Sequence, residues 1–521
     1  MKRKQCAEGA EGDEDCRSLS VTSEEHIKKS QKVEDGAIDW KLYAEEIEQR
    51  LETKSSEEKK RGEAEAENTE CQLWAELSHA RAKLGQWHEA LSAARKAGRS
   101  TFEGRRAEVK ALLGLGRCGE ALTVARDAVG LANDAQESEA DTLLRSAMTA
   151  HYEPIVGERP VRVEYYGKRK GKGLVALRDF KQGDEIFHEE PLVCAPPFFP
   201  AQEKPLCCSN CMRYLDTREA MVDRMVAHVK QSDKAKAAAL PRFDELCPPF
   251  SETEGQMCQG CGVEVYCTTQ CKDDAWRRYH EAACPAYAAL RPYFESEDFY
   301  DIGVMALRIY AIILQNLKAA RGDSLAARLD EAYMPFMHFC KAPFSDVVCY
   351  VAGINKYQDE LVERDELKKY KTVLVQQLHL SLVDALVPEE LRSEEIFSWE
   401  NLDLLMGMVA TNTLQQQDPR TFDRSIPDEL IPFINAHSGQ GLFVVHNCMN
   451  HSCDNNAETT FRHGDRTATV VAVKDIRQGE EVCIDYIGAK RLRWSAPMRR
   501  RRLLREYLFE CACPLCSGAA P

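Results

Sequence analysis

The sequence of 521 residues lacks three features that would each point to a class of protein. It has no uninterrupted apolar run of membrane-spanning length, since the best candidate, residues 302–314, is short and contains Arg308. Its N-terminus has no apolar stretch, which argues against a secretory signal peptide. Its formal net charge of −15 argues against nonspecific nucleic-acid binding by the whole chain. We therefore expect a cytoplasmic and nuclear protein that spans no membrane.

Cysteine, by contrast, is abundant, with 22 residues in the chain. Disulfides rarely persist in a reducing compartment, so closely spaced cysteines there are typical of metal ligands. The closely spaced ones fall in two places, residues 207–284 and Cys453 together with residues 511–516. Hydrophobic residues make up 44% of the chain, which is enough for sizeable cores.

The N-terminal part divides into two regions. Residues 1–66 are rich in Glu, Lys, Ser and Gly and predict a disordered or loosely helical acidic tail. Lys2, Arg3 and Lys4 form a candidate nuclear import signal, for which a solvated tail is the alternative interpretation.

Residues 67–151 have helical periodicity and contain an internal repeat. The pattern Leu-Gly-x-x-x-Glu-Ala-Leu at residues 84–91 recurs 31 residues later, at 115–122. This resembles tetratricopeptide repeats, of which at least three are usually needed, so the helical stretch 137–151 is a candidate to complete the stack. Two interpretations stay open: a groove that binds peptides, or a helical hairpin docked onto the next domain.

The remainder predicts an α+β fold in which a small β domain is split by long insertions. Strand-like alternation appears from about residue 160 and returns at residues 442–487, with helical patterns between. The predicted segments are strands at 160–207, a cysteine-rich segment at 208–284, helices at 285–410, strands at 411–490 and a C-terminal cysteine segment at 491–518.

The cysteine-rich segment contains four closely spaced ligand pairs. They are Cys208 with Cys211, Cys258 with Cys261, Cys267 with Cys271, and His280 with Cys284. Such pairs suit two tetrahedral zinc ions, one held by the first and third pairs and the other by the second and fourth. No coordination position is left open, so we expect a structural role that stabilises a segment too small to fold alone.

This series is similar to the MYND finger, a zinc-binding module for protein interaction. It departs from that pattern in a long insertion, residues 212–257, between the first two pairs. Cys207 or Cys247 could therefore replace an assigned ligand.

Four further motifs resemble the SET domain of protein lysine methyltransferases. They are Gly171-Lys172-Gly173-Leu174, Asn450-His451-Ser452-Cys453, and the segments 479–486 and 506–516. With the finger inserted between them, residues 160–518 resemble the SET and MYND domain-containing family, and most of all its type-5 branch. The fold that this implies is a SET β-fold split by a MYND finger and helical insertions, preceded by the helical repeats.

The resemblance implies a role for each matching residue. Gly171, Lys172 and Gly173 would approach the methionine part of S-adenosylmethionine, and Asn450 and His451 its amino-acid and adenine portions. Phe509 would stack on adenine, and Asn412 would be a further cofactor contact. Tyr486 would be the catalytic tyrosine, also beside the cofactor, and Tyr507 would be a wall of the lysine channel. The ligands of a third zinc ion would be Cys453, Cys511, Cys513 and Cys516.

The expected reaction needs a neutral lysine amine. With a pKa near 10.4, only about one free lysine in several thousand is neutral at pH 7, and a narrow aromatic channel shifts this balance by desolvating the ammonium. The expected substrate is a lysine of a histone or of another protein, for example a ribosomal one. The alternative is an inactive scaffold that recruits partners through the finger and the repeats.

One charged segment has two interpretations. Residues 490–505 contain eight basic residues and no acidic one. They predict either a solvated helix or a surface that contacts a nucleosome or a ribosome.

Overall fold

The computed structural model describes residues 38–57, 63–196, 207–213, 215, 255–294, 300–347, 364–415 and 439–518. These residues belong to two compact units, Met1–Pro154 and Ile155–Pro521, which we describe separately. The predicted import signal, Cys247 and most of the insertion 212–257 lie outside the described residues.

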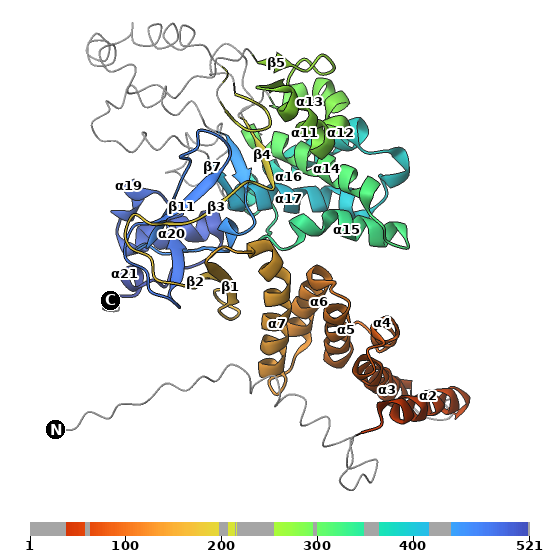
Figure 1. Ribbon diagram of the computed structural model, residues 1–521. Coiled ribbons are helices and arrows are strands. Elements are labelled where there is room, and N and C mark those ends of the chain that lie inside the picture. Colours follow the sequence, from red (N-terminus) through yellow and green to blue (C-terminus); the bar gives the residue numbers. More distant parts are fainter. Residues whose placement is uncertain are drawn as a thin grey trace, which may run out of the picture. The chain divides into compact units, whose positions relative to one another are not determined.

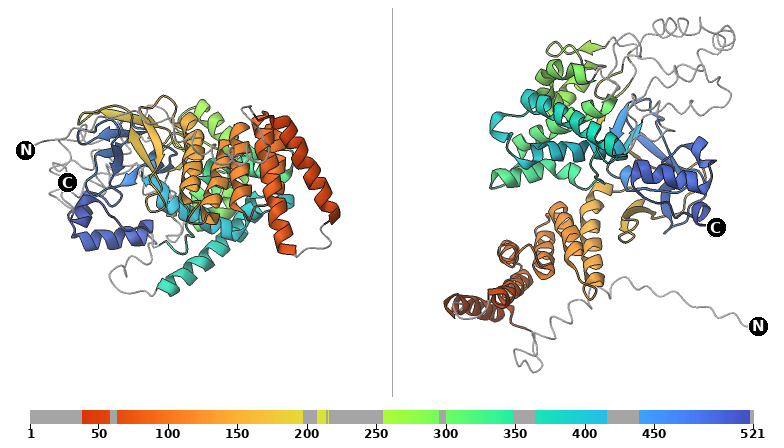
Figure 2. Two further views of the ribbon diagram at one scale, coloured as in Figure 1. Left: turned by 90° about the horizontal axis from the view of Figure 1, so that it is seen from below. Right: turned by 180° about the vertical axis from the view of Figure 1, so that it is seen from behind.

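The first unit is built from helices that follow one another closely. They are α2 (Trp40–Glu57), α3 (Glu63–Lys83), α4 (Trp87–Lys96), α5 (Phe102–Gly114), α6 (Cys118–Leu131) and the first part of α7 (Glu137–Val156). From α2 to α6, each helix packs against the next, and Figure 2 shows them side by side. Short loops between helices favour this antiparallel packing of neighbours.

The prediction of a tail that extends to residue 66 is wrong for its C-terminal part. Helix α2 begins at Trp40, and Tyr43, Ala44 and Ile47 are buried against α3 residues such as Leu73. These side chains recur at helical spacing and therefore form one apolar stripe. The acidic and basic residues between them occupy the opposite face, which gives the segment the composition of a tail.

The internal repeat corresponds to two helical hairpins with the same turn. In the turn between α3 and α4, Gly85 has φ +73°, and between α5 and α6, Gly116 has φ +70°. In each, the next residue donates its N–H to a carbonyl five residues back, at 2.9 Å. Glycine reaches positive φ without a Cβ clash, which explains why it recurs at this position.

The second unit has a central sheet of four strands in the order β1-β2-β12-β9. Their bounds are Val161–Tyr165, Lys172–Ala176, Glu481–Ile484 and Asn450–His451. Strand β12 is antiparallel to β2 and parallel to β9. Segments about 300 residues apart in the chain therefore pair directly.

Three smaller sheets complete the β structure that the structure describes. They are β10 (Ala457–Thr460), β11 (Ala468–Ala472) and β3 (Glu185–Glu189); β4 (Val193–Ala195), β8 (Gln440–Leu442) and β7 (Thr413–Gln415); and β5 (Gln256–Met257) with β6 (Val265–Tyr266). The second unit is thus α+β, with strands from both sides of the inserted segments, as predicted.

Most helices of the second unit lie in sequence between strands β1–β6 and strands β7–β12. They are α11 (Thr269–Ala275), η3 (Trp276–His280), α12 (Glu281–Ala283), η4 (Cys284–Ala286), α13 (Tyr287–Phe294), α14 (Tyr300–Ala319), α15 (Leu325–Met337), α16 (Arg364–Leu386), η6 (Glu389–Leu391), η7 (Glu395–Phe397) and α17 (Trp399–Asn412), with η9 (His446–Cys448), α19 (Ala489–Leu492), α20 (Ala496–Tyr507) and α21 (Pro514–Ser517) later in the chain. Within this unit, α13–α17 gather on one side, with β5 near α13, and β2, β3, β7 and β11 lie with α19–α21 on the other (Figure 1).

Helix α14 is the one described helix that is long and apolar enough to span a membrane, over Ile302–Ala319. Most of that stretch is buried inside the unit, and its centre contains the buried Arg308. This burial is typical of a core helix in a folded domain.

The ends of two strands have local causes or markers. Strand β2 begins at Lys172, directly after Gly171. Strand β8 ends at Leu442, because the carboxylate of Glu189 accepts the N–H groups of Val444, Val445 and His446 at 2.8–2.9 Å. A buried carboxylate with three backbone donors competes well with a strand ladder.

Candidate functional site

The predicted cofactor residues on strands meet where β2, β9 and β12 lie side by side. In the parallel pair, Asn450 lies opposite Cys483. The Asn450 side-chain amide donates to the Lys172 carbonyl and to Glu481 Oε1, both at 2.9 Å. Asn450 thus links three strands, and Glu481 orients it. Glu481 is the first residue of β12, and its sequence position within the 479–486 motif gave it no predicted role.

Two glycines near this junction are required by the chain itself. Gly171 has φ +68°, a conformation that a side chain would strain. Gly173 lies within β2, where a Cβ would come within 2.6 Å of the Tyr166 ring and 2.7 Å of Glu481 Oε1. Any larger residue at position 173 would therefore displace Glu481, and with it Asn450.

His451 is held in one tautomer. Its Nδ1 accepts the backbone N–H of Tyr486 at 3.0 Å, so its proton lies on Nε2, which faces Cys453 Sγ at 3.4 Å. Burial, together with the Arg499 guanidinium, lowers the pKa of His451 to about 4. The ring is therefore neutral at physiological pH and serves as a positioned donor and acceptor.

The ring of Tyr486 forms an aromatic cluster with three other rings, those of His451, Tyr507 and Phe509. Its ring centroid lies 5.4 Å from His451, 4.9 Å from Tyr507 and 6.2 Å from Phe509. The Tyr486 hydroxyl donates to the Met449 carbonyl at 2.6 Å, and the Tyr507 hydroxyl donates to the Tyr486 carbonyl at 3.0 Å. Burial raises the pKa of both, that of Tyr507 to about 12, so both stay protonated. The cluster offers aromatic walls and a fixed hydroxyl.

Asn412 and Lys172 both donate hydrogen bonds to the segment that contains His338 and Cys340. The Asn412 amide donates to the Cys340 carbonyl at 2.8 Å, and Lys172 Nζ donates to the His338 carbonyl at 3.2 Å. Burial, followed by the Cys340 thiol, raises the pKa of Tyr486. The segment 338–341 carries no sequence motif.

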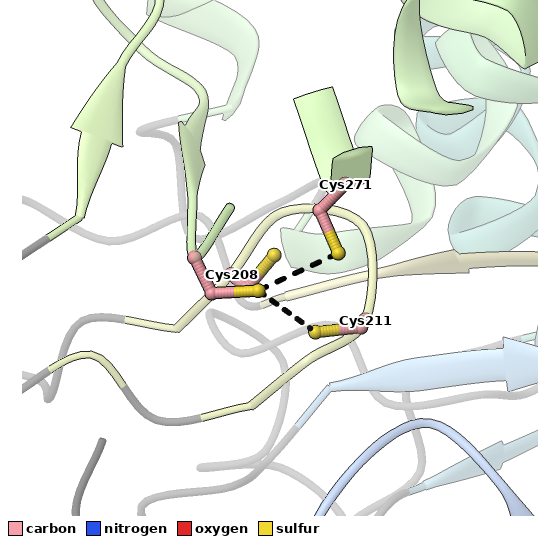
Figure 3. Close-up of side chains that lie close together, drawn as sticks. Cys208, Cys211 and Cys271 are labelled. Atoms are coloured by element: carbon pink, nitrogen blue, oxygen red, sulfur yellow. Dashed lines mark hydrogen bonds between the residues drawn. The ribbon is translucent and has the colours of Figure 1, made fainter. Parts of the chain in front are cut away.

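The twelve predicted metal ligands come together as three groups of four. They are Cys208, Cys211, Cys267 and Cys271; Cys258, Cys261, His280 and Cys284; and Cys453, Cys511, Cys513 and Cys516. In each group, all ligand atoms lie within 4.8 Å of one another. Figure 3 shows three sulfurs of the first group pointing toward one another. The first group includes Cys208 and not the neighbouring Cys207.

The sulfur spacings fit a tetrahedral zinc ion. A Zn–S bond of about 2.3 Å places tetrahedral sulfurs about 3.8 Å apart. The S···S distances are 3.4 and 3.6 Å in the first group, 3.8 Å in the second, and 3.6 and 4.0 Å in the third. All are far longer than a disulfide bond of about 2.05 Å.

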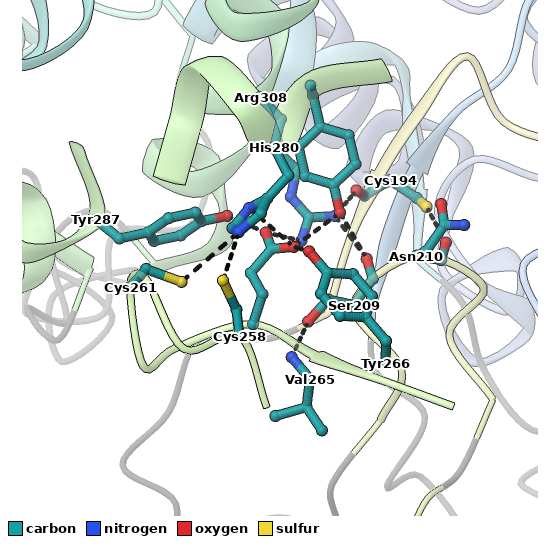
Figure 4. Close-up of polar contacts among 12 residues, drawn as sticks. Cys194, Ser209, Asn210, Cys258, Cys261, Val265, Tyr266, His280, Tyr287 and Arg308 are labelled. Atoms are coloured by element: carbon teal, nitrogen blue, oxygen red, sulfur yellow. Dashed lines mark hydrogen bonds and ion pairs between the residues drawn. The ribbon is translucent and has the colours of Figure 1, made fainter. Parts of the chain in front are cut away.

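A buried charged network supports the second metal group (Figure 4). Glu264 Oε2 lies 3.4 Å from His280 Nδ1, on the side of the ring away from the sulfurs, and Glu264 Oε1 accepts from Arg308 at 2.7 Å. Burial raises the pKa of Glu264, but Arg308 and His280 outweigh it, and the net shift is downward. Glu264 therefore lies between a ligand of the metal group and Arg308 of α14, and it links the two.

The basic segment 490–505 exposes less charge than its sequence suggests. Arg499 is buried, and Arg502 pairs with Glu506 on the same helix. Lys490, Arg493 and Arg501 are exposed. Contact with a nucleosome or a ribosome stays a prediction.

A surface hollow lies beside strand β3. Its lining consists of Arg159, His188, Glu189, Glu190, His463, Asp465 and Thr467. None of the predicted site residues lines it, and it mixes both signs of charge, so we assign it no ligand.

Comparison with known proteins gives a family match. Residues 171–487 match the family model described as "SET domain". The chain is 30% identical over 397 residues to "Protein-lysine N-trimethyltransferase SMYD5" of Mus musculus, covering 69% of this chain and 87% of that protein. The human protein of the same name is 28% identical over the same coverage. "Histone-lysine N-methyltransferase ATXR2" of Arabidopsis thaliana is 26% identical over 49% of this chain and 61% of its own length.

Proposed function

Because this chain belongs to the SET-domain family, in the SET and MYND branch that includes SMYD5, we propose that it is a protein-lysine N-methyltransferase that uses S-adenosylmethionine. The observation that carries the proposal is the convergence of Asn450, His451, Tyr486 and Phe509 at one junction of strands and C-terminal segment. An inactive scaffold would have no need of such an arrangement.

The residues of the junction suit both reactants. S-adenosylmethionine, when bound, supplies an electrophilic methyl group; Asn450, His451, Asn412 and the 171–173 segment would hold it, with Phe509 on its adenine. The rings of Tyr486 and Tyr507 form walls that favour a neutral lysine amine over an ammonium. The Tyr486 hydroxyl donates to Met449, so its lone pairs remain to orient the amine.

We further propose that each of the three ligand groups holds a zinc ion. The third group joins Cys453, two residues after His451, to the cysteines that follow Phe509. A metal ion there would hold Phe509 and Tyr507 against the strand junction. The role is structural, because four protein ligands leave no position for substrate.

The proposal extends to the finger, the repeats, the substrate and the location. The ligand order and interleaved grouping support a MYND-type finger that recruits protein partners. The two hairpins with matching turns support a tetratricopeptide-like region, with a peptide as its ligand. Histone and ribosomal lysines, and both cytoplasm and nucleus, remain our proposals for substrate and location.

The test uses cofactor with a deuterated methyl group, incubated with recombinant full-length protein and cell extract. Mass spectrometry should find deuterated methyl-lysine in defined peptides, and Asn450→Ala should abolish it. Glu458→Ala, at an exposed position on the nearby strand β10, is the matched control and should retain activity. Cofactor binding by thermal shift without any deuterated lysine would favour the scaffold.

A further inference from the structure

A buried arginine contacts two of the four sulfurs in the C-terminal ligand group. Arg499, on α20, is 7% exposed. Its Nε lies 3.1 Å from Cys453 Sγ, and its Nη2 lies 3.4 Å from Cys516 Sγ. Both are within range of hydrogen bonds to sulfur, and both come from one rigid guanidinium.

The remaining donors of this guanidinium are also fixed. Nη2 donates to the Leu515 carbonyl at 3.2 Å, and Nη1 donates to the carbonyls of Leu492 and Trp494. The neighbouring Arg500 donates to the carbonyls of Cys511 and Cys516, at 3.0 and 2.8 Å. Two arginines of the basic segment therefore face inward and bracket the ligand group.

The charge of the group explains why an arginine belongs there. Four thiolates and one zinc ion carry a net charge of −2, and Cys453, Cys511 and Cys516 are all buried. Burial of net charge is costly unless an opposite charge lies in contact with it. Arg499 supplies that opposite charge directly at two of the sulfurs.

One of these sulfurs also faces the cofactor side of the molecule. Cys453 Sγ lies 3.4 Å from His451 Nε2 and so has donors from two directions. The sulfur therefore lies between two N–H donors, Arg499 Nε and His451 Nε2, and negative charge on a metal-bound sulfur strengthens hydrogen bonds of this kind.

We propose that Arg499 is the counter-cation of the C-terminal metal group and sets its affinity for zinc, rather than contributing to the basic surface. Its guanidinium contacts both Cys453 Sγ and Cys516 Sγ, which lie 3.6 Å apart, a spacing that a metal ion requires. The inference rests on the proposed zinc binding at this group, and it assigns to α20 a metal-supporting role that its sequence does not reveal.

The experiment measures zinc affinity at each group separately. Full-length protein loaded with zinc is equilibrated in a series of zinc–chelator buffers, then alkylated with N-ethylmaleimide, and each cysteine is quantified by peptide mass spectrometry. The variant is Arg499→Met, and the matched control is Arg501→Met, which removes the same charge from an exposed position on the same helix. Cysteines of the first two groups serve as internal references.

For Arg499→Met, we expect the C-terminal cysteines to lose protection at a free zinc concentration about 10–100-fold higher than in the wild type. The first two groups, and every group in Arg501→Met, should be unchanged. Arg499→Lys keeps the charge but not the forked geometry, so its shift should be smaller and confined to the same cysteines.

Two results separate the possible failures. If the wild type protects no C-terminal cysteine at any zinc concentration, the proposed third zinc ion is wrong. If the wild type is protected but Arg499→Met and Arg499→Lys both match Arg501→Met, Arg499 has no part in metal binding. Should Arg499→Met deprotect all three groups by unfolding, the lysine variant decides between these outcomes.

Discussion

At the aromatic cluster, a single hydrogen bond to the Met449 carbonyl fixes the hydroxyl of Tyr486. Tyr486→Phe keeps the ring contacts with His451 and Tyr507, so stability and cofactor affinity should barely change. The variant loses the group that orients the amine, and we expect kcat to fall about 100- to 1000-fold with a smaller effect on KM.

Single-turnover methyl transfer on one protein substrate measures this effect. Equal rates for folded, cofactor-bound wild type and variant would remove Tyr486 from the mechanism. A changed number of methyl groups at an unchanged rate would place it instead in the wall that limits product methylation.

A second residue, His446, makes stability depend on pH. Burial lowers its pKa to about 4 in the folded chain, from about 6.5 when unfolded. Between these values, the unfolded chain binds a proton that the folded chain does not, so this contribution is present above pH 6.5 and is lost as pH falls toward 4. We expect His446 to cost about 2 kcal/mol of stability between pH 7 and pH 5.

Urea unfolding of the wild type and of His446→Gln at both pH values isolates this contribution. The glutamine variant should lose less stability on acidification, because it has no imidazole to protonate. Parallel losses in both proteins would show that other groups account for the pH dependence.

At this scale, the sequence indicates the residues that carry motifs and misses those that support them. The metal ligands could be grouped correctly because short spacings restrict which side chains converge. Glu481 and Arg499 act through contacts between strands or helices far apart in the chain, and no local pattern reveals such contacts. The 338–341 segment was missed for the same reason.

Among the elements, the two hairpins of the first unit depend on a close approach of α4 and α5. A Cβ on Gly114 would lie 2.2 Å from the Trp87 ring, so Gly114→Ala should destabilise the chain by about 1–3 kcal/mol. A Cβ on Gly130 in α6 would meet open space, and Gly130 has no positive φ. Gly130→Ala should therefore stabilise the chain by about 0.4–1 kcal/mol.

Calorimetry of the two full-length variants gives the comparison directly. Opposite signs of the change in unfolding free energy are expected, although the two substitutions are chemically identical. Equal changes would mean that helix propensity alone, and not packing against Trp87, governs these positions.

The periodicity of the sequence predicted whether a segment is a helix or a strand, but it did not predict where each helix or strand ends. The segments around β1, β3 and α17 follow their patterns closely. Strand β8 ends early because a carboxylate from β3 captures the backbone that follows it. The burial of α2 depends on a partner helix, so its charged composition alone suggested a tail.

In the whole molecule, all three ligand groups lie in the second unit. We expect three zinc ions per folded chain by elemental mass spectrometry. A chelator should lower the unfolding temperature of the second unit and spare that of the helical first unit, because metal binding is coupled to folding only where the ligands are.

Calorimetry with and without chelator tests this difference. Two zinc ions or fewer on a fully loaded chain would remove at least one group from the assignment. A chelator that left both transitions in place would show that the groups are dispensable for folding.

The pairing of β2 with β12 has a consequence for the order of events during translation. At 5–20 residues per second, β12 leaves the ribosome roughly 15–60 s after β2, because about 300 residues separate them. The ligands of the first two metal groups are all synthesised within that interval. The proposed zinc ions of these two groups could therefore bind before the central sheet closes, while the apolar edge of β2 stays open to other chains. We expect a nascent chain stopped by a premature codon after residue 284 to carry the first two ligand groups and a β2 strand that pairs with β1 but has its other edge open, which would make it a target for chaperones and proteases rather than a functional fragment.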